Sequence, residues 1–229
     1  MVWIRYLLYF LGVAGLTYLL TSLEVAYPGS LRLQVFSSPT DMLGTSEFSP
    51  IELMQPFILG ICGLIMAWVA TNYSSQRPIA IPFGGLALAF IIREIDYFLD
   101  RYFVDNLWQF LIGVAGALVI AYTYRHRRRL QIALGRLWPS PGLVFLFAGA
   151  SILFVFARLV GHEPFWEAIL GNGYQRVVTL AVEELIELMG YMLWLFGSIE
   201  YAYEVRAMIG RAPQPAAVKR RRTQRRLRP

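Results

Sequence analysis

Residues 175–204 read QRVVTLAVEELIELMGYMLWLFGSIEYAYE and combine the length of a membrane span with three internal acids. A bilayer core takes about 20 mostly apolar residues as a helix, and this segment is long enough to cross one. The acids within its apolar run are Glu183, Glu184 and Glu187. Because a carboxylate in hydrocarbon costs roughly 2.5–3.5 kcal/mol on insertion scales, these residues indicate a polar site inside the membrane.

A second apolar segment shows the same combination. Residues 79–100 read IAIPFGGLALAFIIREIDYFLD, with Arg93, Glu94 and Asp96 near the end. We interpret the two segments together, since charges buried in a membrane pair with each other or face a water-filled cavity.

The composition indicates a multi-pass membrane protein. The chain has 229 residues, of which 57% are hydrophobic and 16% charged, whereas soluble domains carry about 25% charged residues. Cys62 is the only cysteine, which excludes an intrachain disulfide. The two histidines are too few for a histidine-rich metal centre.

Hydropathy predicts an all-α, polytopic fold with about six transmembrane helices. The six apolar segments cover residues 2–22, 51–70, 79–99, 107–124, 142–160 and 177–196. We expect the first to be a retained span, because it is longer than a usual signal-peptide core and no small-x-small cleavage site follows it. Residues 1–210 are expected to form the transmembrane domain.

Arginine-rich loops predict the orientation. The loop 125–136 and the segment 211–229 are both strongly basic, which places both in the cytoplasm, as positive loops usually are. Two spans separate them, so the assignment is consistent, and counting back places the N-terminus inside as well. We therefore expect both termini on the cytoplasmic face of the plasma membrane, the inner membrane if the source is bacterial.

The C-terminal segment RAPQPAAVKRRRTQRRLRP, residues 211–229, holds eight basic residues and no acid. It lacks apolar periodicity and is expected to be a disordered cytoplasmic tail. Basic residues near a charged leaflet gain roughly 1 kcal/mol each. Anionic lipid headgroups are therefore its expected partner, in preference to nucleic acid.

Depth along each span predicts which charges meet. At 1.5 Å per residue, Arg93 and Asp96 lie about 21–26 Å from the cytoplasmic end of their span. Entering from outside, Glu183 and Glu184 lie about 9–11 Å deep and Glu187 about 15 Å. Both groups fall in the outer half of the membrane, so we predict that Arg93 pairs with one of these three acids.

Five acids then surround one base at the predicted site. The cation- or proton-binding candidates are Glu94, Asp96, Glu183, Glu184 and Glu187. Arg93 is the internal counter-charge, and Arg158, which leaves the fifth span on the same side, is a second. An excess of buried acid must hold protons, bind a cation, recruit further arginine or face water.

Weak internal similarity suggests two halves. GVAG occurs at residues 12–15 and again at 113–116, and IDYFLD at 95–100 resembles IEYAYE at 199–204. Three spans per half would give the inverted-repeat arrangement of many transporters. The alternative explanation is that small residues simply allow close helix packing.

Three functions fit this pattern, and the cofactor, if any, is unknown. The favoured hypothesis is proton or small-cation transport, with Glu187 and Glu94 titrating. The second is an enzyme, for example a metal-assisted hydrolase, acting on a lipid or lipid-linked substrate from the outer leaflet, with His162 a weak metal-ligand candidate. The third is a non-catalytic subunit of a membrane complex, bound to a protein partner or to further copies of itself.

Overall fold

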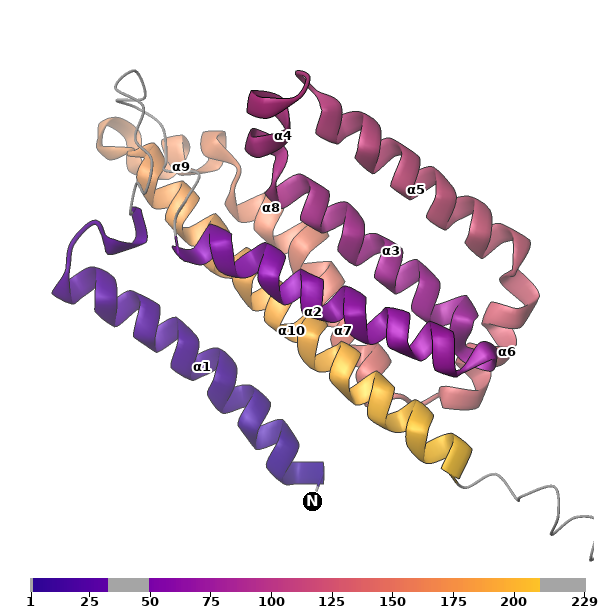
Figure 1. The fold of residues 1–229 in the computed structure, drawn as a ribbon. Helices are drawn as coiled ribbons and strands as arrows, with labels where there is room; N and C mark the ends of the chain where they lie inside the picture. Colours follow the sequence, from indigo (N-terminus) through magenta and orange to yellow (C-terminus); the bar gives the residue numbers. More distant parts are fainter. Residues whose placement is uncertain (1, 33–49, 211–229) are drawn as a thin grey trace, which may run out of the picture.

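A computed structural model describes residues 2–32 and 50–210, and this part of the chain is helical without any strand (Figure 1). The predicted tail, 211–229, lies outside the described residues. The longer helices are α1 (Val2–Ala26), α2 (Pro50–Asn72), α3 (Arg77–Glu94), α5 (Leu107–Arg125), α6 (Arg127–Leu137), α7 (Pro141–Ser151) and α10 (Arg176–Gly210). The shorter ones are η1 (Ser30–Arg32), η2 (Ser74–Gln76), α4 (Asp96–Tyr102), η3 (Ile152–Phe156), α8 (Ala157–Val160), α9 (Glu163–Leu170) and η4 (Gly171–Gly173).

Five helical segments in the described part are long and apolar enough to cross a membrane, judged by length and composition. They are Trp3–Ala26, Pro50–Asn72, Ser74–Glu94, Leu107–Arg125 and Pro141–Val160. These correspond to the first five predicted spans. The sixth predicted span is part of α10, whose 35 residues form one helix through all its acids.

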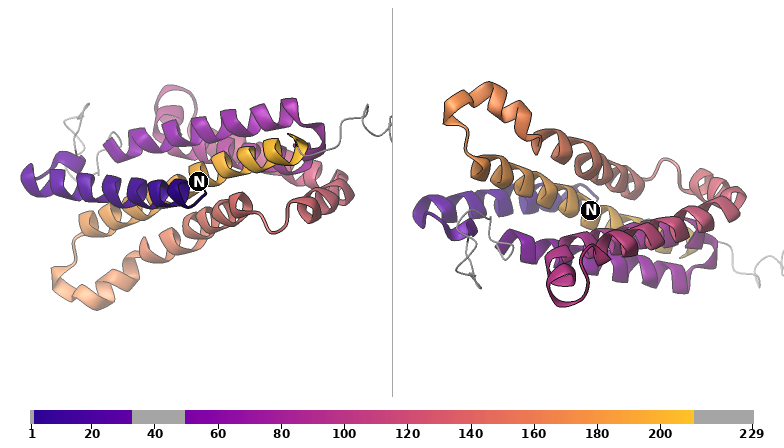
Figure 2. Two further views of the ribbon diagram at one scale, coloured as in Figure 1. Left: turned by 90° about the horizontal axis from the view of Figure 1, so that it is seen from below. Right: turned by 90° about the horizontal axis from the view of Figure 1, so that it is seen from above.

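Helix α10 is the centre of the bundle. Figure 2 shows it between one layer made of α2 and α3 and another made of α7 and α8. Helix α5 packs on the outside of α3, and α1 contacts α10 along a short part of its length. The largest fully buried side chains lie on the central helix: Tyr191, Trp194 and Tyr201.

Glycines bring α7 and α10 into backbone contact. Gly142 and Gly149 on α7 are seven residues apart, as are Gly190 and Gly197 on α10. A Cβ atom on Gly149 would lie 2.8 Å from the carbonyl oxygen of Gly190, and one on Gly142 would lie 2.5 Å from the amide nitrogen of Tyr201. Such small-residue contacts replace the hydrophobic driving force that membrane helices lack in lipid.

The third predicted span is interrupted. We expected one helix over residues 79–99, but α3 ends at Glu94 and Ile95 leaves helical geometry with φ −109° and ψ 18°. The chain then starts α4, which turns away from α3 (Figure 1). The single helix expected over this span is therefore wrong, and Arg93 and Asp96 lie on different helices.

The predicted basic loop 125–136 is largely a helix. In α6, Ala133 and Leu137 are buried against the bundle, while four arginines are exposed: Arg127, Arg128, Arg129 and Arg136. This pattern is typical of an amphipathic helix lying at a membrane surface. A short helix, α9, lies between the fifth and sixth predicted spans.

Candidate functional site

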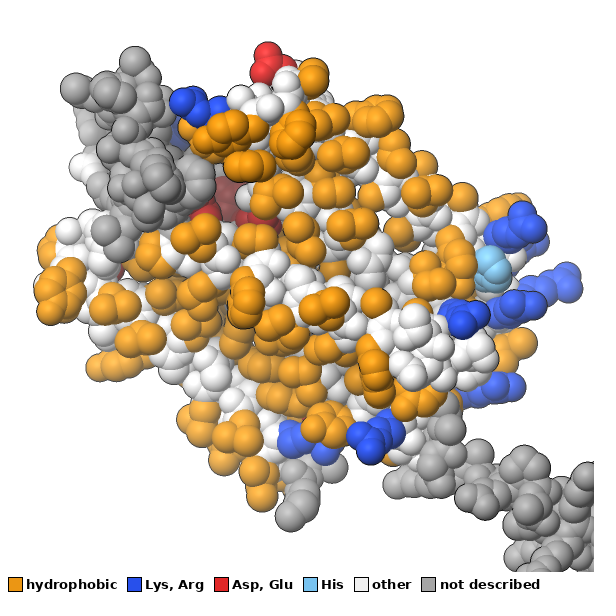
Figure 3. Space-filling view, viewed as in Figure 1, with side chains coloured by type: hydrophobic (Ala, Val, Ile, Leu, Met, Phe, Trp, Pro, Cys, Tyr) orange, Lys and Arg blue, Asp and Glu red, His pale blue; other side chains and the backbone are white. Residues whose placement is uncertain are grey.

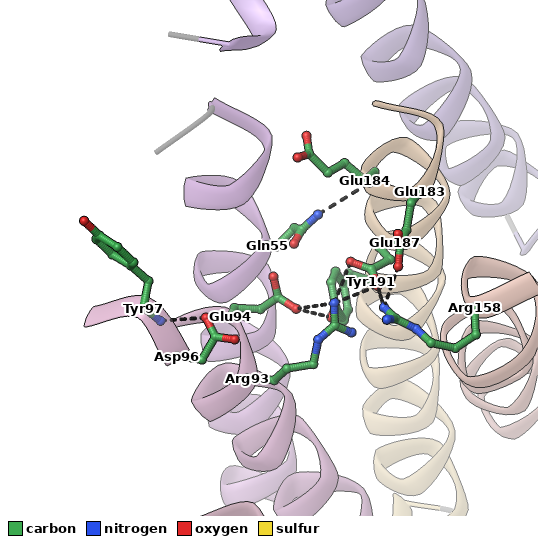
Figure 4. A network of polar contacts seen from close by, with 10 residues as sticks. All are labelled: Gln55, Arg93, Glu94, Asp96, Tyr97, Arg158, Glu183, Glu184, Glu187 and Tyr191. Carbon is green, nitrogen blue, oxygen red and sulfur yellow. Dashed lines mark hydrogen bonds and ion pairs between the residues drawn. The ribbon is translucent and has the colours of Figure 1, made fainter. Parts of the chain in front are cut away.

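Glu187 on α10 is the centre of a buried ionic network (Figure 4). Its side chain accepts hydrogen bonds from Nη2 of Arg93 on α3, at 2.7 Å to Oε1 and 3.0 Å to Oε2. Arg158 on α8 donates to the same Oε1 atom from the opposite side. Only 4% of Glu187 is exposed, so one carboxylate joins three helices away from solvent.

Each arginine also reaches a second carboxylate. Nη2 of Arg93 lies 3.7 Å from Oε1 of Glu94, and Nη2 of Arg158 lies 3.0 Å from Oε1 of Glu183. Glu94 additionally accepts a 2.7 Å hydrogen bond from the hydroxyl of Tyr191. The network therefore runs continuously from α8 through α10 to α3.

Local sequence explains how these side chains meet. Glu183 and Glu187 are four residues apart and thus lie on one face of α10. Gly161, directly after α8, leaves room for the Glu183 carboxylate, which would collide with a Cβ atom there. Arg158 follows η3, a single π-helical turn within the fifth span. Such turns occur mostly as single bulges and often at functional sites.

A polar cavity of about 250 Å³ opens beside this network. Its lining comes from α2, α3, α4 and α10: Glu52, Gln55, Arg93, Glu94, Asp96, Tyr97, Leu180, Glu183, Glu184 and Glu187. Six carboxylates thus face one volume. Arg93 is the one basic residue of this lining among the described residues, and Arg158 reaches Glu187 from outside it.

Glu184 differs from the other acids of the cavity. Within residues 2–32 and 50–210, no group donates a hydrogen bond to its carboxylate and no arginine or lysine pairs with it. The charged groups that act on it are three other carboxylates, those of Glu187, Glu183 and Glu94. Figure 4 shows its side chain directed away from the Arg93–Glu187 pair.

The backbone around Glu184 is held separately. The side-chain amide of Gln55 on α2 donates to the Glu184 carbonyl oxygen at 3.4 Å. Gln55 is itself 1% exposed, so α2 closes one side of the cavity. This contact links α2 to the backbone of α10 and does not involve the Glu184 carboxylate.

All five candidate acids from the sequence line the cavity, and both predicted counter-charges bind Glu187. Asp96, at the start of α4, accepts a 2.6 Å hydrogen bond from the amide of Tyr97. His162 is exposed before α9 and does not line the cavity. In the described part of the chain, no three His, Cys, Asp or Glu residues are grouped as metal ligands.

Sequence reasoning did not assign a role to Tyr191. It lies one helical turn beyond Glu187, on the same face, and that spacing was the available signal. A tyrosine inside an apolar run normally indicates core packing, and Tyr191 is indeed fully buried. Its hydroxyl nevertheless contacts Glu94, as buried tyrosine hydroxyls usually find a partner.

A second polar cluster lies at the other end of α10 and is locally compensated. Glu200, 1% exposed, accepts hydrogen bonds from Arg5 at 2.7 and 3.0 Å and from the Tyr9 hydroxyl at 2.8 Å. Glu204 accepts from the Gly142 amide at 2.9 Å and from the Ser140 hydroxyl, at the N-terminus of α7. These contacts fasten α1 and α7 to α10.

No family model, curated protein or solved structure matches this chain.

Proposed function

We propose that this protein is a six-span transporter of protons or a small cation, embedded in the plasma membrane (the inner membrane if bacterial) with both termini in the cytoplasm. The observation that carries the proposal is the unpaired carboxylate of Glu184 in a cavity that six acidic residues and one arginine line. Ionised carboxylates at that density repel each other and lose hydration, so binding a proton or a cation relieves both costs.

The charge distribution supports the proposed orientation. Figure 3 shows arginine side chains gathered at the end where α6 lies, while carboxylates sit in a recess at the opposite end. With α6 in the cytoplasm, α10 enters from the outer side at Arg176 and reaches the inner side near Gly210. The cavity then lies in the outer half of the membrane.

The roles of the carboxylates differ in this proposal. Glu187 is occupied by two arginines and serves as the fixed counter-charge that holds α3, α8 and α10 together. Glu184 is the exchanging group, because its carboxylate has no competing cation among the described residues. Glu94, held by Tyr191 and farther from Arg93, is the second exchanging group.

Helix packing supports transport as well. Helix α2 packs on α3 as α7 packs on α10, whereas α1 touches α10 over a much shorter length than α5 touches α3. Two inverted halves of three spans each would produce the first of these correspondences. The contact of α2 with α10 is broader than the corresponding contact of α3 with the fifth span. That second contact consists of ring contacts of Phe83 with Phe147 and of Phe90 with Phe154.

Flux through reconstituted protein tests the proposal. Proteoliposomes with a pH-sensitive dye inside are given a pH gradient, with Na⁺ or K⁺ outside in separate runs. We expect cation-dependent or proton flux above that of protein-free liposomes, and its loss in Glu184→Gln. Glu167→Gln is the matched control, because Glu167 is an exposed acid on α9 that does not line the cavity.

Two results would reject the assignment. Absence of flux in wild-type protein under all gradients would exclude transport of these ions. Unchanged flux in Glu184→Gln, with Glu94→Gln also unaffected, would exclude the proposed exchanging groups even if the protein is a transporter.

A further inference from the structure

A separate groove of about 410 Å³ lies between α2 and α10, near the end of α10 remote from the acidic cavity. Three residues of α2 and four of α10 line it: Leu64, Ile65, Trp68, Ile199, Ala202, Tyr203 and Arg206. Arg206 carries the only charge in this lining. The groove is therefore an apolar channel with one positive end.

Arg206 is free to bind an anion. Within the described residues it forms no ion pair and no hydrogen bond, and its side chain is exposed. The nearby Arg5 differs, because Glu200 occupies its guanidinium and the ring of Tyr203 lies 5.0 Å from it. The Arg5 guanidinium is thus neutralised, whereas that of Arg206 is available.

The rest of the groove suits a hydrocarbon chain at the edge of a bilayer. Leu64 is 73% exposed, and Trp68 and Tyr203 are 42% and 51% exposed. Tryptophan and tyrosine are enriched where the hydrocarbon core meets the headgroups. Arginine binds phosphate oxygens through strong, charge-assisted hydrogen bonds. An amphipathic molecule with an anionic head matches both parts of the groove.

We propose that this groove binds one anionic glycerophospholipid of the cytoplasmic leaflet, with its phosphate on Arg206 and one acyl chain between α2 and α10. A second copy of the chain fits the charge less well, because a two-fold contact through this groove would bring both Arg206 side chains into one interface. The lipid site uses neither the cavity nor its acids, and only its assignment to the cytoplasmic leaflet rests on the orientation proposed above.

Native mass spectrometry of delipidated protein in detergent tests this proposal. Phosphatidylglycerol and phosphatidylcholine with identical acyl chains are titrated separately. We expect wild-type protein to bind phosphatidylglycerol about tenfold more tightly, which corresponds to about 1.4 kcal/mol. Arg206→Ala should remove that preference. Ala202→Phe, which fills the apolar part of the groove, should weaken binding of both lipids.

Arg128→Ala is the matched control, because Arg128 is an exposed arginine of α6 and does not line the groove. It should keep the wild-type preference, and circular dichroism should show unchanged helix content in all three variants. Equal affinity of wild-type protein for the two lipids, or a preference that survives Arg206→Ala, would overturn the proposal. A dimer that forms in place of lipid binding would overturn it in favour of a second copy.

Discussion

Two isosteric substitutions on α10 should separate stability from function. Glu187→Gln should lower the stability of the fold, whereas Glu184→Gln should abolish flux and leave the stability nearly unchanged. Both remove one negative charge, and the two residues are three positions apart on one helix. Glu187 accepts hydrogen bonds from two arginines, whereas the Glu184 carboxylate has none among the described residues. The pair therefore separates a carboxylate that holds the fold from one that is available to a ligand.

The expected magnitude follows from the burial of the three partners. Removing one partner of a buried ion pair costs roughly 3–5 kcal/mol. The side chains of Arg93 and Arg158 are 30% and 49% exposed, and each keeps another carboxylate, which lowers that cost. We therefore expect Glu187→Gln to lower the free energy of unfolding by about 2 kcal/mol after discounting for solvent.

Glu184→Gln removes a charge whose electrostatic neighbours are all negative. Its effect on the free energy of unfolding should stay within about 0.5 kcal/mol, as for substitutions that break no contact. It should instead abolish flux. The two predictions together require that stability and activity are lost in different variants.

Thermal unfolding in one detergent, at one scan rate, measures the first effect. A loss of 2 kcal/mol in a chain of this size lowers Tm by about 4–8 °C. Equal Tm shifts in the two variants, or a larger shift in Glu184→Gln, would refute the division of roles. Arg158→Ala serves as an internal check and should shift Tm less than Glu187→Gln, since Glu187 then keeps Arg93.

Two further predictions concern the packing of the bundle. Gly149→Ala should lower Tm markedly, because the added Cβ atom would meet the backbone of α10. Gly113→Ala on α5 adds a Cβ atom with no other atom within 4 Å, so it should raise the free energy of unfolding by up to about 1 kcal/mol. Thermal unfolding compares the two variants, and equal Tm shifts would contradict the close contact between α7 and α10. Arg5→Ala should cost about 1–3 kcal/mol by leaving Glu200 buried without its cation, and adding Glu200→Gln should recover most of that loss in a double-mutant cycle.

The sequence predicted which charged residues meet, but not how each one pairs. Hydropathy and a rise of 1.5 Å per residue were enough to place Arg93 level with the acids of residues 183–187. To identify Glu187 as the partner, one must also know how α3 and α10 are rotated about their own axes. That rotation depends on the whole packing around α10, including the glycine contacts with α7, and no local pattern records it.

Two departures from the predicted fold have local causes that a hydropathy profile misses. Residues 86–95, around the end of α3 at Glu94, contain no glycine or proline, so no helix-breaking residue signals this end. Helix α6 was expected as a loop because its arginines dominate the composition. Its burial of Ala133 and Leu137 becomes evident only once the neighbouring α3 is in place.

The extra residue in the π-helical turn η3 sets the direction in which Arg158 points around the helix axis. Residues 152–156 have one residue more than an α-helical turn would use over the same height, and each residue of an α-helix rotates the chain by about 100°. Deleting one residue from this turn would leave the hydropathy and length of the span almost unchanged. It would rotate Arg158 roughly a quarter of the way round the helix axis, away from Glu187. The direction in which this arginine points therefore depends on the number of residues in the turn and not on the identity of any one side chain.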